Sequence, residues 1–406
     1  MGGLLTGVTG TNRAPPLGAP HGLHYFAGMP ISCTPRIFAL WSALLLVAGC
    51  VPQGGATPAV PPTVDPVTRL VLARSGEGAP VYRIPALTVT KAGTVLASYD
   101  ARPSGSDLPS HIAVMLRRST DGGRTFAPPV TVRADSAPLG FGDPSFVVDR
   151  MTGRIFLFYA AGARQGFFGA RAGTGANDPD VLQADYSYSD DDGRSWRHRR
   201  ITAQIKDSAW GGLFASSGEG IQLRRGPHAG RLIQQYAVRF RSANWAASAY
   251  SDDHGEHWRM GALVGPGSDE NKVVELADGT LMLNIRAKPT RRVALSSDGG
   301  VSWSSPQDEP LLPDPGNNGS IIRLAPDAPT QDARAHMLLF SNTESTNARV
   351  NLTVKLSCDD GRSWPVRRTI EAGPAAYSTL TALGNGRIGL LYEGGDYATI
   401  TLATFD

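Results

Sequence analysis

Residues 152–160 read Thr-Gly-Arg-Ile-Phe-Leu-Phe-Tyr-Ala, a turn followed by a short apolar strand. Related segments occur five more times, at 92–100, 229–237, 278–286, 333–342 and 385–393. Their turn positions are 49 to 77 residues apart, a length that suits about four short strands with their turns. No long segment with a helical apolar period lies between them. The sequence therefore predicts an all-β fold, a six-bladed β-propeller, in which residues 67–73 supply a strand that closes the ring.

A second motif, Ser-x-Asp-x-Gly-x-x-aromatic, is superimposed on these repeats. It occurs five times, at 119–126, 189–196, 251–258, 296–303 and 357–364. An Asp that accepts backbone amide protons, a Gly that adopts positive φ and a buried aromatic ring together predict a self-contained turn. Because the same turn in five blades cannot face one site five times, we assign it a structural role. His254 and His257 lie in one such turn, so we interpret their spacing as incidental and not as a metal site.

The composition limits the classes of function. The chain has 406 residues with 47 Gly, 30 Pro and 18% charged residues, which is typical of a folded, turn-rich protein. Its formal charge is +3 and no stretch of clustered Lys and Arg occurs, so no nucleic-acid partner is expected. The motifs of zinc proteases, serine hydrolases and P-loop nucleotide sites are also missing from the sequence.

The first 66 residues are expected to direct export. Residues 37–49 form an uncharged, mostly apolar run behind Arg36, shorter than the roughly 20 residues of a spanning helix. Small residues directly before Cys50 resemble a bacterial lipobox, which predicts a cell-surface lipoprotein anchored in the membrane through Cys50. The alternative is a secreted protein with an ordinary signal peptide. We expect an extension and signal peptide over 1–49, a Pro-rich tether over 50–66 and a monomeric propeller over 67–406.

Equivalent positions in the six repeats carry unusual charges. Seven residues after the turn positions lie Asp100, Ala160, Ala237, Arg286, Asn342 and Glu393. A charge at the end of an apolar inner strand loses hydration unless it is paired. Two interpretations therefore stay open: a polar pocket about the propeller axis, or an internal salt-bridge network that fills the channel.

Further ordered segments lead to a family. Residues 82–85 read Tyr-Arg-Ile-Pro ahead of the five turns, and other segments follow at 98–103, 269–276, 283–286, 377–380 and 391–393. This set resembles the bacterial exo-sialidase (neuraminidase) family with Asp-box repeats, over residues 67–406. The resemblance implies an exo-α-sialidase that removes terminal sialic acid from glycans, glycoproteins or glycolipids, with no cofactor and no metal.

The resemblance also implies how the substrate is held. It assigns the substrate carboxylate to Arg83, Arg286 and Arg349, since planar guanidinium groups suit an anion held by charge-assisted bonds. Arg349 is placed mainly by its order in the chain. Glu393 is expected to hold Arg83 in place through a bidentate pair.

One acidic residue of the 98–107 segment is implied to act as general acid and base. The resemblance assigns this role to Asp107, on a loop rich in Gly, Ser and Pro, with Asp100 as the competing carboxylate. Arg102 and Asp143 are expected to contact the sugar's 4-hydroxyl.

The implied nucleophile is Tyr377, and its proton acceptor is Glu270, with Glu275 as the rival. Because a sialoside carries a carboxylate on its anomeric carbon, it would repel an anionic nucleophile, whereas a neutral phenol is not repelled; sialidases are the tyrosine exception among glycosidases. The expected reaction is a hydrolysis with net retention.

Other functions remain compatible with these residues. They are a non-catalytic sialic-acid-binding propeller, a trans-sialidase, an intramolecular trans-sialidase that releases an anhydro product, and an enzyme that prefers the deaminated sugar. Trp210, Phe214 and Trp245 are candidates for the wall of the pocket, or else buried core aromatics.

Overall fold

The computed structural model describes residues 66–384 and 386–406, which form five β-sheets with little helix. The expected extension and signal peptide over 1–49, Cys50, and the tether up to residue 65 lie outside the described residues. In the described part of the chain, no helix has the length and apolar character needed to cross a membrane. The predicted all-β fold class is confirmed.

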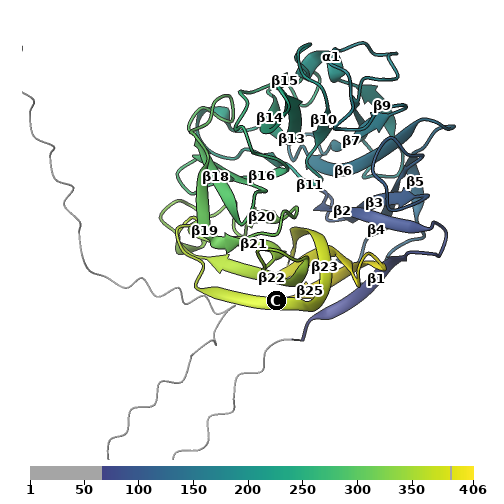
Figure 1. Ribbon diagram of the computed structural model, residues 1–406. Coiled ribbons are helices and arrows are strands. Elements are labelled where there is room, and N and C mark those ends of the chain that lie inside the picture. The colour runs from purple at the N-terminus through teal and green to yellow at the C-terminus, as the bar shows by residue number, and fades with distance from the viewer. Residues whose placement is uncertain (1–65, 385) are drawn as a thin grey trace, which may run out of the picture. The chain divides into compact units, whose positions relative to one another are not determined.

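The sheets follow one another around a common centre, with β2, β16 and β20 towards the middle and β5, β9 and β19 towards the outside (Figure 1). The first sheet consists of β2 (Val81–Val89), β3 (Val95–Arg102), β4 (Ala113–Ser119) and β5 (Val130–Arg133). The second consists of β11 (Gly218–Glu219), β6 (Gly140–Val148), β7 (Ile155–Gly162), β8 (Gln183–Ser189) and β9 (Arg197–Arg200). The third consists of β10 (Leu213–Ala215), β12 (Ile221–Gln222), β13 (Leu232–Phe240), β14 (Ala243–Ser251) and β15 (Arg259–Met260).

The C-terminal half of the chain forms the other two sheets. One consists of β16 (Asn271–Glu275), β17 (Leu281–Ile285), β18 (Thr290–Ser296) and β19 (Gln307–Pro313). The other, with seven strands, consists of β20 (Ser320–Arg323), β21 (Leu338–Thr343), β22 (Val350–Ser357), β23 (Val366–Gly384), β24 (Arg387–Gly394), β25 (Thr399–Phe405) and β1 (Thr68–Arg74). Short helical turns lie in the loops: α1 (Thr202–Ile205), η1 (Gly226–His228) and η2 (Ala333–His336).

Strand β1 joins the two ends of the described domain. It pairs antiparallel with β25, from Thr68 opposite Thr404 to Arg74 opposite Thr399. The prediction that the segment near residues 67–73 supplies a strand beside the C-terminal repeat is confirmed.

The six repeat strands occupy inner positions of their sheets or sheet halves: β7 is third after β11 and β6, and the others are second. They are β3, β7, β13, β17, β21 and β24, and each has a hydrogen-bonded strand on both sides. They are therefore inner strands, as expected, although another strand of each sheet lies closer to the centre. A strand in this position is covered on both faces and both edges, which explains why β7 is apolar and buried over its whole length.

The five Ser-x-Asp turns share one hydrogen-bond pattern. In each turn the Ser Oγ donates to Asp Oδ1 at 2.7–2.9 Å and accepts from the Gly backbone amide at 2.8–2.9 Å. That Gly has a φ of +76 to +87° in all five turns, a conformation that other residues adopt at a cost. His254 Nδ1 lies 2.7 Å from Asp149 Oδ2, and His257 Nδ1 lies 2.7 Å from Asp253 Oδ2. Each of these imidazoles therefore contacts a different carboxylate.

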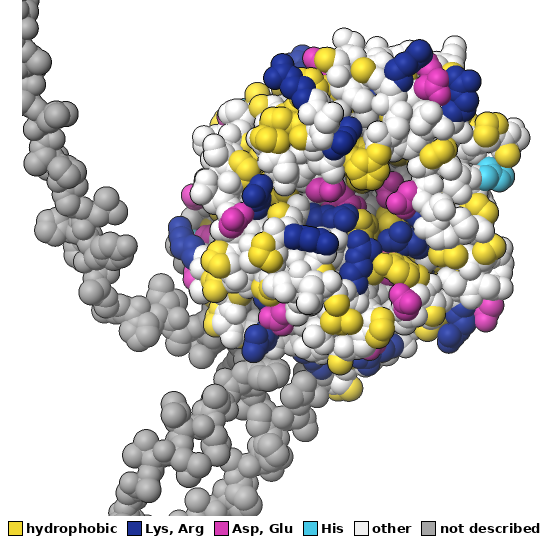
Figure 2. Space-filling view, in the orientation of Figure 1, with side chains coloured by type: hydrophobic (Ala, Val, Ile, Leu, Met, Phe, Trp, Pro, Cys, Tyr) yellow, Lys and Arg dark blue, Asp and Glu magenta, His cyan; other side chains and the backbone are white. Residues whose placement is uncertain are grey.

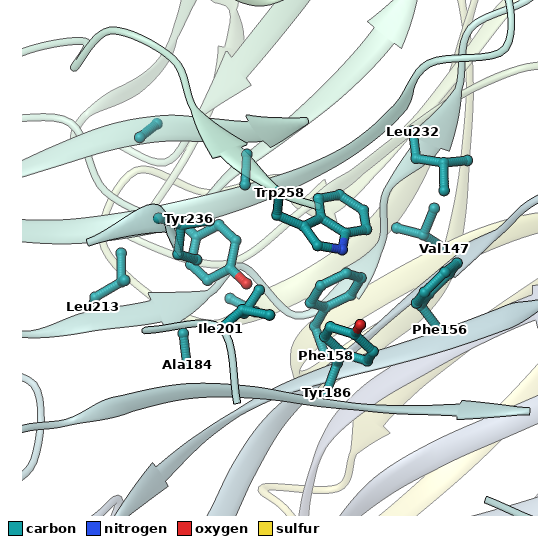
Figure 3. Packing of buried hydrophobic residues seen from close by; sticks show 14 of the residues in the cluster. Val147, Phe156, Phe158, Ala184, Tyr186, Ile201, Leu213, Leu232, Tyr236 and Trp258 are labelled. Atoms are coloured by element: carbon teal, nitrogen blue, oxygen red, sulfur yellow. The ribbon is translucent and has the colours of Figure 1, made fainter. Parts of the chain in front are cut away.

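The aromatic residue of each turn extends inward. Trp258 is buried in a cluster between the second and third sheets, together with Val147, Tyr186 and Tyr236 (Figure 3). Its ring meets Phe156 and Phe158 edge-on, with centroids 5.8 and 5.0 Å apart. Each such buried side chain contributes roughly 1.5–3 kcal/mol to stability. The turns thus hold neighbouring sheets together by packing, and none of their residues lines the cavity of the candidate active site.

Candidate active site

All five sheets contribute to one cavity of about 280 Å³. A hollow near the middle of the face in Figure 2 gathers Lys and Arg side chains beside Asp and Glu side chains. The cavity is lined by Arg83, Ile84, Asp107, Leu108, Asp143, Ala160, Phe167, Phe168, Leu182, Phe214, Asp269, Glu270, Arg286, Arg349 and Tyr377. The structure thus brings seven of the expected site residues to one cavity.

A buried phenol and a buried carboxylate form the floor of the cavity. Tyr377 Oη donates a hydrogen bond to Glu270 Oε2 at 2.5 Å and accepts one from Arg286 Nη1 at 2.7 Å. Arg286 Nη1 also contacts Glu270 Oε2, and the Arg286 amide donates to the Glu270 carbonyl at 2.8 Å. Burial raises the pKa of Tyr377 well above its usual value, although Arg286, Arg349 and Arg83 oppose this. The phenol is therefore neutral near pH 7, with its proton directed at Glu270.

Three guanidinium groups surround the Tyr377 ring. The Cζ atoms of Arg83, Arg286 and Arg349 lie 5.5, 6.0 and 5.3 Å from the ring centroid. All three side chains line the cavity. Such a group of cations can hold a carboxylate by charge-assisted hydrogen bonds.

Glu393 connects two distant strands behind this group. Its fully buried carboxylate accepts from Arg83 Nε at 3.0 Å, from the Ile84 amide at 2.9 Å and from the Tyr377 amide at 3.0 Å. Ile84 has a φ of +59°, which is strained for a β-branched residue and costs on the order of 1–3 kcal/mol. Glu393 thus fixes the bulge of β2 and holds Arg83, the contact that the family resemblance implied.

Arg349 reaches the cavity with help from a residue that the sequence did not indicate. Its Nη1 donates to Tyr397 Oη at 2.9 Å and its Nη2 to the Gly316 carbonyl at 3.1 Å. The Tyr397 ring lies 4.7 Å from the Arg83 guanidinium carbon. Tyr397 belongs to no repeat or motif of the chain, so no sequence signal pointed to its place between the two arginines.

Asp107 lies at the mouth of the cavity, with 73% of its side chain exposed. Its Oδ1 accepts from Arg102 Nη1 at 2.6 Å and lies 3.7 Å from Arg83 Nη1. Partial burial raises the pKa of this carboxyl, but Arg102, Arg83 and Arg286 outweigh that effect, so the pKa is lowered. Arg102 itself is 1% exposed and does not line the cavity.

The remaining charged residues of the segment lie at different depths. Asp143 lines the cavity at a φ of +64°, and burial together with Asp100 raises its pKa well above the usual range. Asp100 is fully buried beside Arg102. The rival Glu275 accepts hydrogen bonds from the Arg224 and Arg225 amides and does not line this cavity.

The charged residues at the repeat ends form ion pairs, as a salt-bridge network requires, and one of them also lines a polar pocket. Asp100, Arg286 and Glu393 each make an ion pair, with Arg102, Glu270 and Arg83 respectively. Arg286 also lines the cavity, as does the uncharged Ala160. Ala237 and Asn342 do not line it.

One wall of the cavity is aromatic. Phe167 meets Phe214 edge-on at 4.8 Å and Phe168 at 5.1 Å, and Phe168 is 77% exposed. Of the three aromatic candidates, Phe214 lines the cavity, whereas Trp210 and Trp245 pack against the apolar cluster of the second and third sheets. Phe167 and Phe168 lie in the loop after β7, where the sequence has no repeat that could single them out.

A buried lysine lies below the Tyr377 and Glu270 pair. Lys272 lies on β16 and follows Glu270, the residue directly before that strand, by two positions, a spacing that puts both side chains on the same face of extended chain. Its ammonium donates to the Ser216 carbonyl at 3.3 Å and also contacts the Ser217 carbonyl. Burial lowers the pKa of Lys272 to about 7, against the opposing effect of Glu270 and Glu219.

Among the described residues, no group of three His, Cys, Asp or Glu side chains is arranged to hold a metal ion.

Comparison with known proteins shows which family the chain belongs to. Residues 93–390 match the BNR repeat-like domain. The sialidase of Micromonospora viridifaciens is 52% identical over 375 residues, which cover 89% of this chain and 58% of that protein. The chain therefore spans less than two thirds of this relative.

Solved structures agree on the fold. A Hadza microbial sialidase matches with a TM-score of 0.74 and 31% identity, over 81% of this chain and 66% of that one. The intramolecular trans-sialidase of Ruminococcus gnavus matches with a TM-score of 0.72 over 83% of this chain and 96% of that one, but at 21% identity this likeness concerns the fold alone. From the domain match, the identity and the repeated turns, we conclude that the chain belongs to the BNR-repeat family that includes the bacterial sialidases.

Proposed function

We propose that this protein is an exo-α-sialidase that hydrolyses terminal sialic acid from glycoconjugates with net retention. The observation that carries the proposal is the phenol of Tyr377, hydrogen-bonded to Glu270 and surrounded by three arginines. An arginine group beside a neutral nucleophile suits a substrate whose reacting carbon bears a carboxylate. The 52% identity to a sialidase supports the same substrate class.

In the first step, Arg83, Arg286 and Arg349 bind the substrate carboxylate and Tyr377 Oη attacks the anomeric carbon. The phenolic proton passes to Glu270, which already accepts its hydrogen bond. Asp107 protonates the glycosidic oxygen as the bond to the aglycone breaks. In the second step, Asp107 takes a proton from water, the water oxygen bonds to the anomeric carbon, and the phenol leaves with the proton from Glu270. Two inversions give net retention.

For the sugar's 4-hydroxyl, we propose Asp143 as the contact. Asp143 lines the cavity, whereas Arg102 is enclosed by protein on all sides. A protonated Asp143 can donate as well as accept a hydrogen bond, which suits a hydroxyl partner.

For the fold, we propose a six-bladed propeller. Support comes from the seven-stranded sheet, in which β23 pairs with β22 through residues 366–374 and with β24 through residues 375–384. Counted as two blades that share β23, this sheet and the other four make six. The count also agrees with the six repeat strands.

A test of the function is to follow sialyllactose by proton NMR with the purified protein and its Tyr377→Phe and Asp107→Ala variants. Initial release of α-sialic acid, lost or greatly slowed in both variants, would support the proposal. The controls are Tyr250→Phe and Asp308→Ala, whose side chains do not line the cavity. Release of an anhydro product would indicate an intramolecular trans-sialidase. Transfer of sialic acid to the lactose acceptor would indicate a trans-sialidase. Binding without turnover would indicate a lectin.

We also propose that the protein is exported and anchored through a lipid on Cys50. The support is the small-residue segment before Cys50 and the Pro-rich stretch after it. Mass spectrometry of detergent-extracted protein tests this proposal, because an unmodified Cys50 in the mature chain would remove it.

A further inference from the structure

Arg102 is fully engaged by protein groups at the edge of the cavity. Its Nε and Nη2 both donate to Asp100 Oδ2, at 3.0 and 2.7 Å. Its Nη1 donates to Asp107 Oδ1 at 2.6 Å and to the Ser106 carbonyl at 3.3 Å. Four N–H directions of the guanidinium are therefore used inside the protein, and the side chain is almost without exposed surface.

The backbone explains why these groups meet. Asp100 and Arg102 are two residues apart on β3, so their side chains leave the strand on the same face. Gly142 allows this approach, because a Cβ there would lie 3.2 Å from Asp100 Oδ2. The pair stands directly below the loop that carries Asp107.

The charges around Asp107 change when a substrate binds. In the free protein its carboxylate faces Arg102, Arg83 and, at longer range, Arg286. A substrate carboxylate held by Arg83 and Arg286 cancels much of their effect, which leaves Arg102 as the main cation acting on Asp107. A general acid needs a pKa near the working pH, so the charge on Arg102 must itself be compensated.

Asp100 is the group that compensates it. Burial raises the pKa of Asp100 to about 6, against Arg102, so the carboxyl is mostly ionised at pH 7. Burial, together with Asp100, raises the pKa of Asp143, the other neighbouring carboxyl, well above its usual value, so it is the weaker counter-charge for Arg102. Arg83 also faces Asp100 but is paired with Glu393.

We propose that Asp100 and Arg102 form a positioning pair that orients the Asp107 carboxyl and keeps it able to protonate the leaving group. The proposal rests on the proposed function of Asp107 as general acid. It assigns Asp100 a role through Arg102, without contact to the substrate, and it gives Arg102 a task towards Asp107 inside the protein.

The test compares two sialosides that share the sugar and differ in the leaving group. Sialyllactose releases a poorly acidic alcohol and needs the acid, whereas 4-methylumbelliferyl sialoside releases an acidic phenol and needs it little. In Asp100→Asn, Arg102 is left uncompensated and lowers the pKa of Asp107 in the substrate complex. We expect the alkaline limb of kcat for sialyllactose to move down by about one pH unit, with about a tenfold loss on that limb and a change of less than about threefold for the aryl substrate.

A second variant should act in the opposite direction. Arg102→Gln removes the cation that faces Asp107, so the alkaline limb for sialyllactose should move to higher pH. In an Asp107→Ala background, Asp100→Asn should have no further effect on the ratio of the two substrates. The matched control is Asp185→Asn, because Asp185 also accepts two hydrogen bonds from one arginine, Arg200, at 2.8 and 3.0 Å, and does not line the cavity.

The outcomes separate the two proposals. Failure of the unmodified protein to turn over either substrate overturns the proposed function. The positioning role alone is overturned if the unmodified protein turns over the substrates but Asp100→Asn loses activity equally for both. In that case the alkaline limb of kcat would also not shift. An effect of Asp100→Asn that persists in the Asp107→Ala background overturns it as well.

Discussion

The phenol oxygen of Tyr377 lies 2.5 Å from Glu270 Oε2, although the two residues are 107 positions apart in the sequence. The same oxygen accepts a hydrogen bond from Arg286. The phenol is thus held as a donor towards a carboxylate and as an acceptor from a cation, which is the arrangement that an incipient phenolate needs. Loss of the proton would leave the oxygen anion beside Arg286.

Tyr377→Phe should abolish turnover while leaving substrate binding in place. The variant removes the attacking oxygen but keeps the ring around which the three arginines pack. We expect kcat to fall at least about 10³-fold, measured by sialic acid release, with the dissociation constant of a sialic acid ligand changed less than about tenfold by calorimetry. Activity that survives in this variant would require another nucleophile.

Arg349→Ala should weaken substrate binding more than it slows the chemical step. One charge-assisted contact is worth about 1.5–3 kcal/mol, so we expect KM to rise about 10- to 150-fold. Steady-state kinetics with sialyllactose measure this, with the exposed Arg367→Ala as control. An unchanged KM would place Arg349 outside the carboxylate site.

Substrate binding should raise the pKa of Asp107. In the free protein that pKa is lowered, chiefly by Arg102 against the effect of burial, and a bound carboxylate cancels part of the arginine charge. Because kcat/KM reports the free protein and kcat the complex, the alkaline limb of kcat should lie at higher pH than that of kcat/KM. Full pH–rate profiles measure both limbs, and coincident limbs would contradict the argument.

Asp359→Ala should lower stability without changing the cavity. Asp359 accepts from Ser357 Oγ, the Ser363 amide and Ser363 Oγ at 2.6–2.9 Å, and we expect a loss of about 1–3 kcal/mol. Desolvation opposes these bonds, yet the pKa is lowered, so the stabilisation is present above about pH 4 and is lost as the pH falls through the folded-state value. Urea unfolding at pH 7 and pH 3 measures both effects. Asp359→Asn, which keeps one acceptor oxygen, should lose less.

Lys272 should make the stability depend on pH in the alkaline range. Burial lowers its pKa to about 7 in the folded protein, while the unfolded chain keeps the usual value near 10.5. Between these values the unfolded state binds more protons, so the free energy of unfolding rises with pH by up to about 1.4 kcal/mol per unit. Lys272→Met should lack this slope in urea unfolding from pH 7 to 9. Parallel curves for the two proteins would contradict the prediction.

The turns were the most predictable part of the molecule, because the hydrogen bonds among Ser, Asp and Gly that define them form within eight residues. The place of the repeat strands was not predictable in the same way, since a strand such as β7 is apolar whether it lies second or third in its sheet. Apolar content reports burial and not position along a radius.

The positions of Glu393 and Arg286 at the site were predictable, because each is a charged residue at the end of a repeat and each belongs to the ordered set of family segments. Phe168 and Tyr397 were missed because each lies in a loop or turn whose path depends on contacts made elsewhere. The contact between Arg102 and Asp100 was not predicted, although the spacing of the two residues already put both side chains on one face of a strand. That i, i+2 pairing was the available signal.

The contact between Arg83 and Glu393 spans 310 residues of chain. At a synthesis rate of about 5–20 residues per second, Arg83 leaves the ribosome roughly 15–60 seconds before its counter-charge exists. Strand β1, made early, likewise pairs with β25, which is the last strand of the described chain to be made. A nascent chain that ends just before residue 377 already holds the three arginines of the cavity, but neither Tyr377 nor Glu393. The pocket is therefore complete only after β23 and β24, which carry Tyr377 and Glu393, have been synthesised.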